Sequence, residues 1–330
     1  MVTDRYICKG AAVEVEAVYK RRWFLCNFQK SPNAMLYTLD QLPNVRVTLT
    51  ATVVAAVKAA AVKKSSFKKA FPTFSKSKET KGRVDVLRSD VEDNEGMVFM
   101  RLGKQGVILF SRQGLSNMAE TPIELSDGIS ASCIEELFQL LKPYFFKGME
   151  GSNAEEIMIA ILNSPKPRFA KSAGNNTKPF EPEVWNAQRK SVMYACILAA
   201  LENESTYNRY LSFVPKLVEE LGEIDELYIV EANSDDTFWA NNRFAGETAD
   251  RIEQLLEAEA DLDLIGATKR VNKESNAMGK SGGENVLGEI LTDLLTTFRY
   301  KTHAEFMEDM RPAKRVKTCH GEGRSLTCPW

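Results

Sequence analysis

An apolar stripe near the middle of the chain constrains the fold more than any other feature. Its residues recur at the spacing of one buried helix face: Ile134, Leu137, Phe138 and Leu141. Pro143 follows and is expected to stop or bend this helix. A face of this kind needs other apolar elements to cover it, so we expect the chain to be organised around residues 135–142.

Polar side chains follow the edge of the same predicted helix. Glu135 and Gln139 are four residues apart and therefore share one strip of surface, with Lys142 one turn further on. A carboxylate, an amide and an amine thus border an apolar face. This pattern fits either the solvated edge of an ordinary amphipathic helix or part of a binding site.

The composition is typical of a soluble globular protein. The 330 residues are 44% hydrophobic and 27% charged, which suits one large domain or two small ones. A formal net charge of -2 gives no overall argument for binding to nucleic acid or a membrane surface. The first ten residues carry charges where a signal peptide needs an apolar core, and no apolar stretch approaches the roughly 18 residues of a membrane span. We therefore expect a cytoplasmic protein without membrane contact.

The cysteines and histidines do not predict a metal site. The six cysteines are scattered without a C-x-x-C pair, as reduced thiols of a cytosolic protein would be. The two histidines, His303 and His320, form no cluster with cysteines in a segment that looks folded. The sequence therefore predicts neither a metal nor another cofactor.

Changes in composition divide the chain into four parts. Residues 1–62 form a small N-terminal unit or extension, in which a strand over 45–50 and an Ala-rich helix over 51–62 are expected. A basic linker follows over 63–95. The main domain is expected over 96–300, and a polar, disordered tail over 301–330.

The linker has two interpretations. Between Lys63 and Arg83, lysines alternate with phenylalanines, which is the pattern of an arm that contacts phosphates and stacks on bases. The same composition also fits a solvated linker with no partner. A nucleic-acid partner therefore depends on this segment alone.

The main domain is predicted to be α+β and predominantly helical. Buried strands are expected over 107–110 and 227–230. Helices are predicted over residues 134–142, in a segment that ends at Ser164-Pro165, and over 185–201, 207–221, 246–262 and 285–298. A flexible loop is predicted over 279–283.

Several separated motifs occur in the order found in the NADAR (YbiA-like) family, which this chain resembles over residues 107–299. The matching positions are Phe110, Ser116-Asn117, Asp127-Gly128, Glu135-x-x-Phe138-Gln139-x-x-Lys142, Ser164-Pro165, Trp185 with Val192-Met193, Glu231-Ala232 through Asp236 and Trp239, and Gly283-x-Asn285-x-Leu287-Gly288-x-x-Leu291. The resemblance implies a YbiA-like single domain with a small N-terminal extension. It also implies an N-glycosidase that cleaves a ribose C1′–N bond and needs no cofactor.

The resemblance implies two substrate classes, ADP-ribosylated bases and ribosylamino-pyrimidine phosphates. Glu135 is the candidate that stabilises an oxocarbenium-like sugar and activates water, and Asp236 is the second carboxylate. Phe110 and Trp239 are candidates for stacking on the leaving base. The full set of candidate substrate-binding residues is Phe110, Ser116, Asn117, Gln139, Lys142, Trp185, Trp239, Gly283 and Asn285.

Some of these residues also have purely structural interpretations. Trp185 and Trp239 are equally typical of core packing, and Asn285 near a predicted helix start is typical of an N-cap. Lys142 fits a solvated helix end that the helix dipole favours.

The chain departs from the family pattern in its basic residues. Ser172-Ala173, Ala200-Leu201 and Leu295 stand where the family has Gly-Arg, Lys-Phe and an arginine. A helical insertion also separates Trp239 from Gly283. These departures leave open a second interpretation, a catalytically weakened binding or interaction module for ADP-ribose-type ligands or modified nucleic acid.

Overall fold

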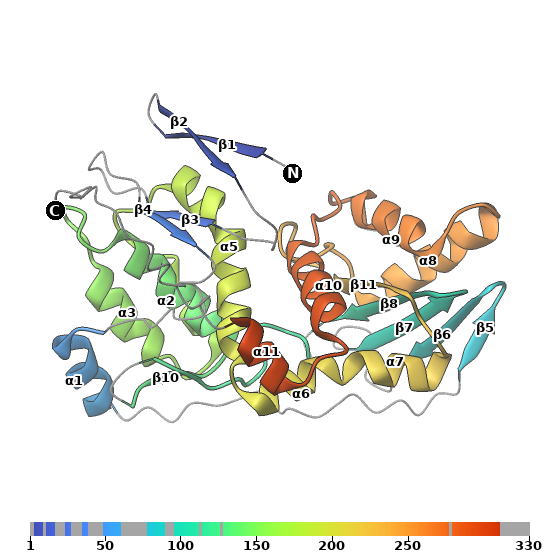
Figure 1. Cartoon of the computed structure of the whole chain (residues 1–330), viewed down its shortest axis with the longest axis horizontal. Helices are drawn as coiled ribbons and strands as arrows, with labels where there is room; N and C mark the ends of the chain where they lie inside the picture. Colours follow the sequence, from blue (N-terminus) through green and yellow to red (C-terminus); the bar gives the residue numbers. More distant parts are fainter. Residues whose placement is uncertain are drawn as a thin grey trace, which may run out of the picture.

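The computed structural model confirms the α+β, mostly helical class (Figure 1). The main domain places helices on both faces of a five-stranded sheet and extends one side into a helical lobe. The structure describes residues 3–8, 11–16, 24–27, 35–38, 49–60, 78–89, 96–111, 114–125, 128–276 and 279–310.

The sheet is mixed, and its strand order is β11-β8-β7-β6-β5. β11 pairs in parallel with β8, whereas the other neighbours pair antiparallel. The two strands expected from short apolar runs are both present, as β8 and β11. The strands are β5 (Glu79–Lys81), β6 (Val84–Arg88), β7 (Met97–Leu102), β8 (Gln105–Phe110) and β11 (Glu226–Glu231).

Alternate residues of β6, β7, β8 and β11 contribute to two different cores, because side chains point to opposite faces of a sheet. Phe99, Ile108 and Ile229 belong to the main core that extends into the helical lobe. Their neighbours Val98 and Val107 face a second core formed with α8 (Ala245–Ala258) and α9 (Leu264–Lys273). Figure 1 shows these two helices above the sheet and α7 (Phe213–Leu221) below it. The helix predicted over 246–262 is present as α8, whereas the helix predicted over 207–221 is divided into α6 (Glu204–Leu211) and α7.

The helical lobe is built around α2 (Ile134–Phe146), which buries its predicted apolar stripe. Pro143 does not end this helix. A proline within a helix removes one backbone hydrogen bond, and the burial of Phe146 beyond it favours continuation. The other helices of the lobe are α3 (Ala154–Leu162), α4 (Pro167–Gly174), α5 (Pro182–Leu201), α6 (Glu204–Leu211) and α10 (Val286–Phe298).

The expected polar tail is wrong for its first part. His303–Met310 form α11, and Phe306 in this helix is fully buried. Its ring lies 5.0 Å from the rings of Tyr207 and Phe298, and the Tyr207 hydroxyl donates to the carbonyl of Lys301 at 2.9 Å. One aromatic anchor among polar residues leaves no periodic signal, which is why the sequence did not predict the helix. Residues 311–330 lie outside the described residues.

The predicted linker contributes to the sheet where the structure describes it. Residues 78–89 contain β5 and β6, so the sheet begins before the expected boundary at residue 96. The guanidinium of Arg83 donates to carbonyls of Leu256 and Glu259 at the end of α8, and Lys78 pairs with Asp85 at 2.8 Å. The rest of the basic arm, 63–77, lies outside the described residues.

Short elements complete the described chain. The expected Ala-rich helix is present as α1, next to α3. The expected strand over 45–50 falls outside the described residues except for Leu49 and Thr50, which are not in a strand. These elements are β1 (Thr3–Cys8), β2 (Ala11–Glu16), β3 (Phe24–Asn27), β4 (Met35–Thr38), α1 (Ala51–Ala60), β9 (Ile123–Glu124) and β10 (Ser130–Ala131).

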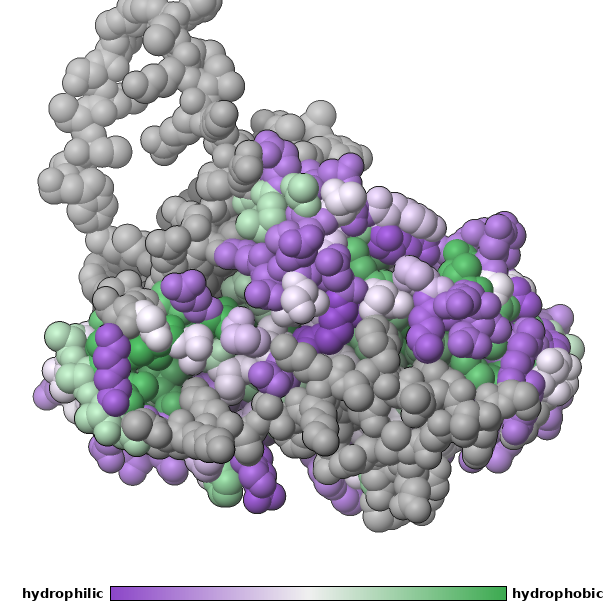
Figure 2. Space-filling model, turned by 90° about the horizontal axis from the view of Figure 1, so that it is seen from below, coloured by the Kyte–Doolittle hydropathy of each residue, from purple (hydrophilic) through white to green (hydrophobic). Residues whose placement is uncertain are grey.

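The surface is chemically mixed. On the face seen in Figure 2, hydrophilic residues alternate with smaller apolar areas. Within the ranges given above, no helix combines the length and the apolar character that crossing a bilayer requires.

Replacement of Phe306 by alanine should destabilise the protein, because it leaves a cavity between α11, α6 and α10. Such large-to-small changes in a core cost about 3–5 kcal/mol. Urea unfolding of Phe306→Ala should show this loss in the free energy of unfolding. The matched control is Tyr300→Ala, because the Tyr300 side chain is 83% exposed and its removal leaves no cavity. Equal unfolding free energies for the two variants would contradict the assignment of Phe306 as an anchor.

Candidate functional site

The parallel strands β8 and β11 end side by side. Phe110 and Glu231, their last residues, are directly paired in register. The chain leaves β8 toward Asn117 and leaves β11 toward Asp236. Ligand sites form preferentially beyond the carboxyl ends of parallel strands, where such loops diverge. Polar residues from two distant parts of the sequence therefore meet at this edge.

Glu135 is the most constrained polar residue at this edge. Its side chain is buried, and both carboxylate oxygens accept hydrogen bonds from side-chain amides. Asn117 Nδ2 donates to Oε2 at 2.6 Å, and Gln139 Nε2 donates to Oε1 at 2.9 Å. The backbone N–H of Glu135 also donates to the carbonyl of Asn117 at 2.8 Å. The orientation of the carboxylate is thus fixed from two sides.

The start of α2 explains why Glu135 lies here. The Sγ atom of Cys133 caps the helix by accepting from the N–H of Glu136 at 3.4 Å. The carboxylate of Glu136 accepts in return from the N–H of Ser132 at 2.9 Å. This reciprocal cap sets the first turn of the helix, where the helix dipole favours negative charge. Glu135 occupies that turn and faces inward.

Gln139 has one polar atom free for a further interaction. Its Oε1 is buried and makes no hydrogen bond within the described part of the chain. A Cβ atom added to Gly174 of α4 would lie 2.3 Å from this oxygen. Glycine at position 174 therefore allows α4 to approach α2 closely beside Gln139.

Two lysines offset the negative charge at this edge. Burial raises the pKa of Glu135, and Asp236 adds to the rise, whereas Lys171 of α4, the Gln139 amide and Lys142 oppose it. Burial lowers the pKa of Lys142, and Glu135 opposes that shift. Lys142 Nζ also donates to Asn175 Oδ1 at 3.1 Å.

Asp236 shapes the loop after β11. Its Oδ1 accepts from the N–H groups of Phe238 at 3.0 Å and Trp239 at 2.8 Å. Its Oδ2 lies 3.8 Å from Lys171 Nζ. The loop places the half-buried Trp239 ring edge-on to Phe138, with 5.4 Å between centroids. Asp236 thus links the loop backbone to the positive charge of α4.

Glu231 is a third carboxyl at this edge. It is buried at the end of β11, and its pKa is raised to about 8. Burial is the largest cause of this rise, Asp236 and Glu135 add to it, and Lys171 opposes it. Glu231 is therefore mostly protonated at neutral pH. Glu231 belongs to one of the sequence motifs, but its role depends on Glu135 and Asp236 beside it, which the sequence does not bring together. Lys171 belongs to no motif.

Asn285 and Gly283 hold the sheet to α10. Asn285 has a left-handed backbone, with φ of 55°, and its side chain does not cap the helix although it occupies the N-cap position. Its Oδ1 accepts from the N–H of Glu231 and its Nδ2 donates to the carbonyl of Ile229, both at 2.9 Å. A Cβ atom on Gly283 would lie 2.0 Å from the Ala240 carbonyl oxygen. Asn285 thus secures β11, and Gly283 allows the segment before α10 to approach the backbone of Ala240 and Asn241.

Three further candidates lie in the core. Phe110 has no exposed surface, and Ser116 and Trp185 are each 4% exposed. The Trp185 ring packs 5.3 Å from that of Phe138 and lies 5.7 Å from Lys142 Nζ. Six predicted site residues therefore lie together at the carboxylate edge: Asn117, Glu135, Gln139, Lys142, Asp236 and Trp239. The other five are buried or contact the backbone near this edge: Phe110, Ser116, Trp185, Gly283 and Asn285.

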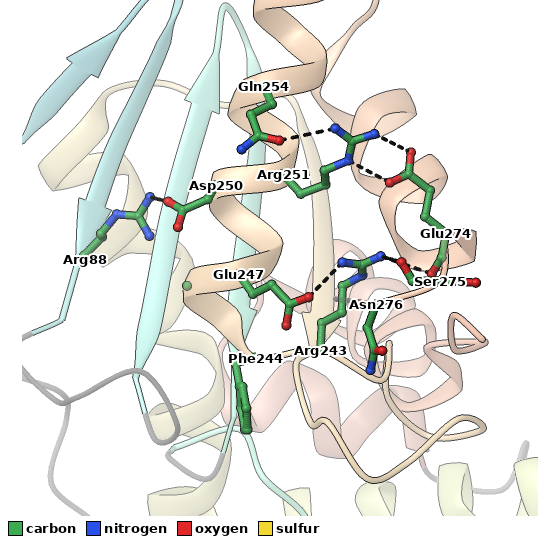
Figure 3. Close-up of a pocket in the computed structure, with 11 residues that line it drawn as sticks. Arg88, Arg243, Phe244, Glu247, Asp250, Arg251, Gln254, Glu274, Ser275 and Asn276 are labelled. Atoms are coloured by element: carbon green, nitrogen blue, oxygen red, sulfur yellow. Dashed lines mark hydrogen bonds and ion pairs between the residues drawn. The ribbon is translucent and has the colours of Figure 1, made fainter. Parts of the chain in front are cut away.

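A pocket of about 690 Å³ beside α8 has a different character (Figure 3). Figure 3 shows that its arginines point at carboxylates: Arg88 lies 2.8 Å from Asp250, Arg251 2.8 Å from Glu274, and Arg243 3.0 Å from Glu247. Because each of these arginines is paired with a carboxylate, the charged residues of this pocket form ion pairs that stabilise the contacts of α8 with neighbouring segments. In the ranges that the structure describes, no three His, Cys, Asp or Glu side chains are arranged as metal ligands.

Comparison with known families matches the model described as the NADAR domain to residues 104–299. No curated protein matches the chain significantly.

The raised pKa of Glu231 predicts a pH-dependent stability. Between its ordinary pKa of 4.5 and about 8, the folded protein holds a proton that the unfolded chain has released. The free energy of unfolding should therefore fall as pH rises through this range, with a slope of up to about 1.4 kcal/mol per pH unit from this group.

Urea unfolding between pH 5 and pH 9 measures this slope, where the chosen range follows from the raised pKa. Glu231→Gln should flatten the profile, because glutamine does not titrate. Glu226→Gln changes the exposed residue at the opposite end of β11 and should keep the wild-type profile. The assignment fails if the Glu231→Gln and wild-type profiles are parallel.

Proposed function

Because this chain belongs to the NADAR family, which contains N-glycosidases, we propose that it hydrolyses a ribose C1′–N bond. The bond would belong to an ADP-ribosylated base or nucleotide, or to a ribosylamino-pyrimidine phosphate.

The observation that carries this proposal is the environment of Glu135. Cleavage of a C1′–N bond develops positive charge on the sugar, and a fixed carboxylate stabilises that charge. The two amides of Asn117 and Gln139 hold Glu135 in one orientation, so it need not reorganise during the reaction. Its raised pKa also makes it a better proton acceptor than an exposed glutamate.

The reaction needs one group that accepts a proton and one that donates. The C1′–N bond breaks with its electron pair moving to the base nitrogen, which takes up a proton. A water oxygen then bonds to C1′ and loses a proton to Glu135. Glu231 is the candidate donor for the leaving nitrogen, because its pKa of about 8 keeps the carboxyl protonated at neutral pH.

Neighbouring side chains are candidates for binding the substrate and take no part in the proton transfers. Trp239 offers a half-buried aromatic surface on the loop that Asp236 orders. Lys171 and Lys142 place positive charge beside the carboxylates, where sugar hydroxyl and phosphate oxygens would bind. Gln139 Oε1, which is buried without a partner among the described residues, is an acceptor for a sugar hydroxyl.

A second candidate function follows from the replaced basic residues. Ala173 and Leu295 stand where the family resemblance places arginines. A protein that lost phosphate contacts would bind ADP-ribose-type ligands or modified nucleic acid without turnover. The basic arm over 63–83 remains the candidate for nucleic-acid contact, although its described members Lys78 and Arg83 already pair within the fold.

Glu135→Gln should abolish hydrolysis while it preserves the fold. Removal of one positioned acid–base group costs about 10²–10⁴-fold in rate. Mass spectrometry of the released base, with ADP-ribosylated guanine nucleic acid and ribosylamino-pyrimidine phosphates as substrates, measures the effect. Glu155→Gln, on an exposed position of α3, is the matched control and should keep the wild-type rate.

The pattern of outcomes separates the two functions. Release by wild type and Glu155→Gln, but not by Glu135→Gln, supports the glycosidase and identifies its substrate class. If no folded variant releases a base but all bind ADP-ribose, the binding module is the better description.

A further inference from the structure

A pocket of about 910 Å³ lies between α5, α9 and the segment that precedes α10. Asn186 and Lys190 of α5 line it together with residues 281–284. Lys269 and Lys273 of α9 complete one wall. The pocket therefore depends on α9, which belongs to the segment that separates Trp239 from Gly283 and distinguishes this chain from the family pattern.

The two lysines of α9 are available for an anionic ligand. Both are exposed, and neither has a carboxylate within 4.0 Å among the described residues. Lys190, by contrast, pairs with Glu289 at 3.3 Å. Lys269 and Lys273 are four residues apart and thus share one face of the helix. Two lysines on one helix face can together contact an anionic group such as a diphosphate.

A buried amide adds a directional donor to the pocket. Asn272 lines it, is only 4% exposed, and its Nδ2 makes no hydrogen bond of good geometry within the described residues. Its Oδ1 is already used, because it accepts from Asn241 Nδ2 at 3.3 Å. The amide also lies near the Tyr228 hydroxyl, where it partly offsets the burial that raises the tyrosine's pKa. A donor held in this way favours an oxygen-rich ligand.

Phe238 and Arg189 lie between the pocket and the carboxylate edge. The Phe238 ring lines the pocket and packs against Trp239, with 4.8 Å between centroids. The guanidinium of Arg189 lies 3.3 Å from the centre of the Phe238 ring. Burial lowers the pKa of Arg189, while Glu284 in the pocket and Asp236 at the carboxylate edge both oppose the shift. Arg189 therefore lies close to both sites.

We propose that this pocket binds the diphosphate of an ADP-ribosyl substrate whose reacting ribose lies at Glu135. The inference rests on the proposed function and selects ADP-ribosylated substrates over ribosylamino-pyrimidine phosphates. Lys269 and Lys273 meet the two phosphates, Asn272 donates to a phosphate oxygen, and Arg189 lies between the diphosphate and the sugar. The α9 lysines thereby supply positive charge in a chain that has Ala173 and Leu295 where the family pattern has arginines.

Isothermal titration with ADP and with ribose 5-phosphate tests the proposal at low ionic strength. The wild type should bind ADP more tightly than ribose 5-phosphate. In Lys269→Gln/Lys273→Gln, ADP affinity should fall by about tenfold or more, because two charge-assisted contacts are lost. The matched control is Lys104→Gln, since Lys104 is exposed beside the opposite end of β8 and pairs only with Asp225 among the described residues.

Further variants separate this inference from the proposed function. Lys269→Arg/Lys273→Arg should retain ADP binding, which excludes a general loss of structure as the cause. Glu135→Gln should also bind ADP normally, because it removes the reacting group only. Lysine-dependent ADP binding without hydrolysis would leave the pocket assignment standing and remove the glycosidase. Equal ADP affinity in the wild type and the double glutamine variant, or no ADP binding by the wild type, would overturn the pocket assignment whatever the activity.

Discussion

Parallel pairing of β8 with β11 joins segments that are 121 residues apart in sequence, as the side-chain contact of Gln105 with Glu226 illustrates. The helices α2 to α6 of the lobe lie between these strands in the chain, so their arrangement depends on where the two strands meet. Asn285 secures the pairing from the α10 side by bonding to the backbone of Ile229 and Glu231. Gly288 permits this close approach, since a Cβ atom there would lie 2.3 Å from the carbonyl oxygen of Ile229. The carboxyl ends of both strands thereby face the start of α2.

Burial of several carboxyls at one edge has a cost in stability that the fold offsets locally. Removal of charged groups from water is unfavourable unless hydrogen bonds or opposite charges compensate. Glu135 receives two amide donors, Asp236 receives two backbone donors and faces Lys171, and Glu231 holds a proton. The burial of each of the three carboxyls is thus compensated in a different way within one site. Differences of this kind allow one group to accept a proton while another donates one.

The helices α8 and α9 give the sheet its second core and change the surface next to the site. Val98 and Val107 would face water without them, because α8 and α9 cover the face that the helical lobe leaves open. The apolar sides of the two helices face the sheet, while Lys269 and Lys273 of α9 face the pocket beside Phe238. A segment required to bury one face of a sheet can therefore also alter which ligands the neighbouring site accepts.

The sequence by itself determined the elements whose apolar residues repeat locally. It predicted the apolar stripe of α2, the apolar runs of β8 and β11, and the separated motifs of the NADAR family. Periodicity and motif spacing are properties of short segments, so they can be recognised without the fold. Only the tertiary structure decided that α2 continues through Pro143, that Phe306 anchors a last helix, and that β5 and β6 join the sheet. It also decided that Glu231 and Lys171 meet Glu135, while Phe110 and Asn285 turn to the core and the backbone. Burial, hydrogen-bond partners and pKa depend on contacts between residues far apart in sequence, which no local pattern specifies.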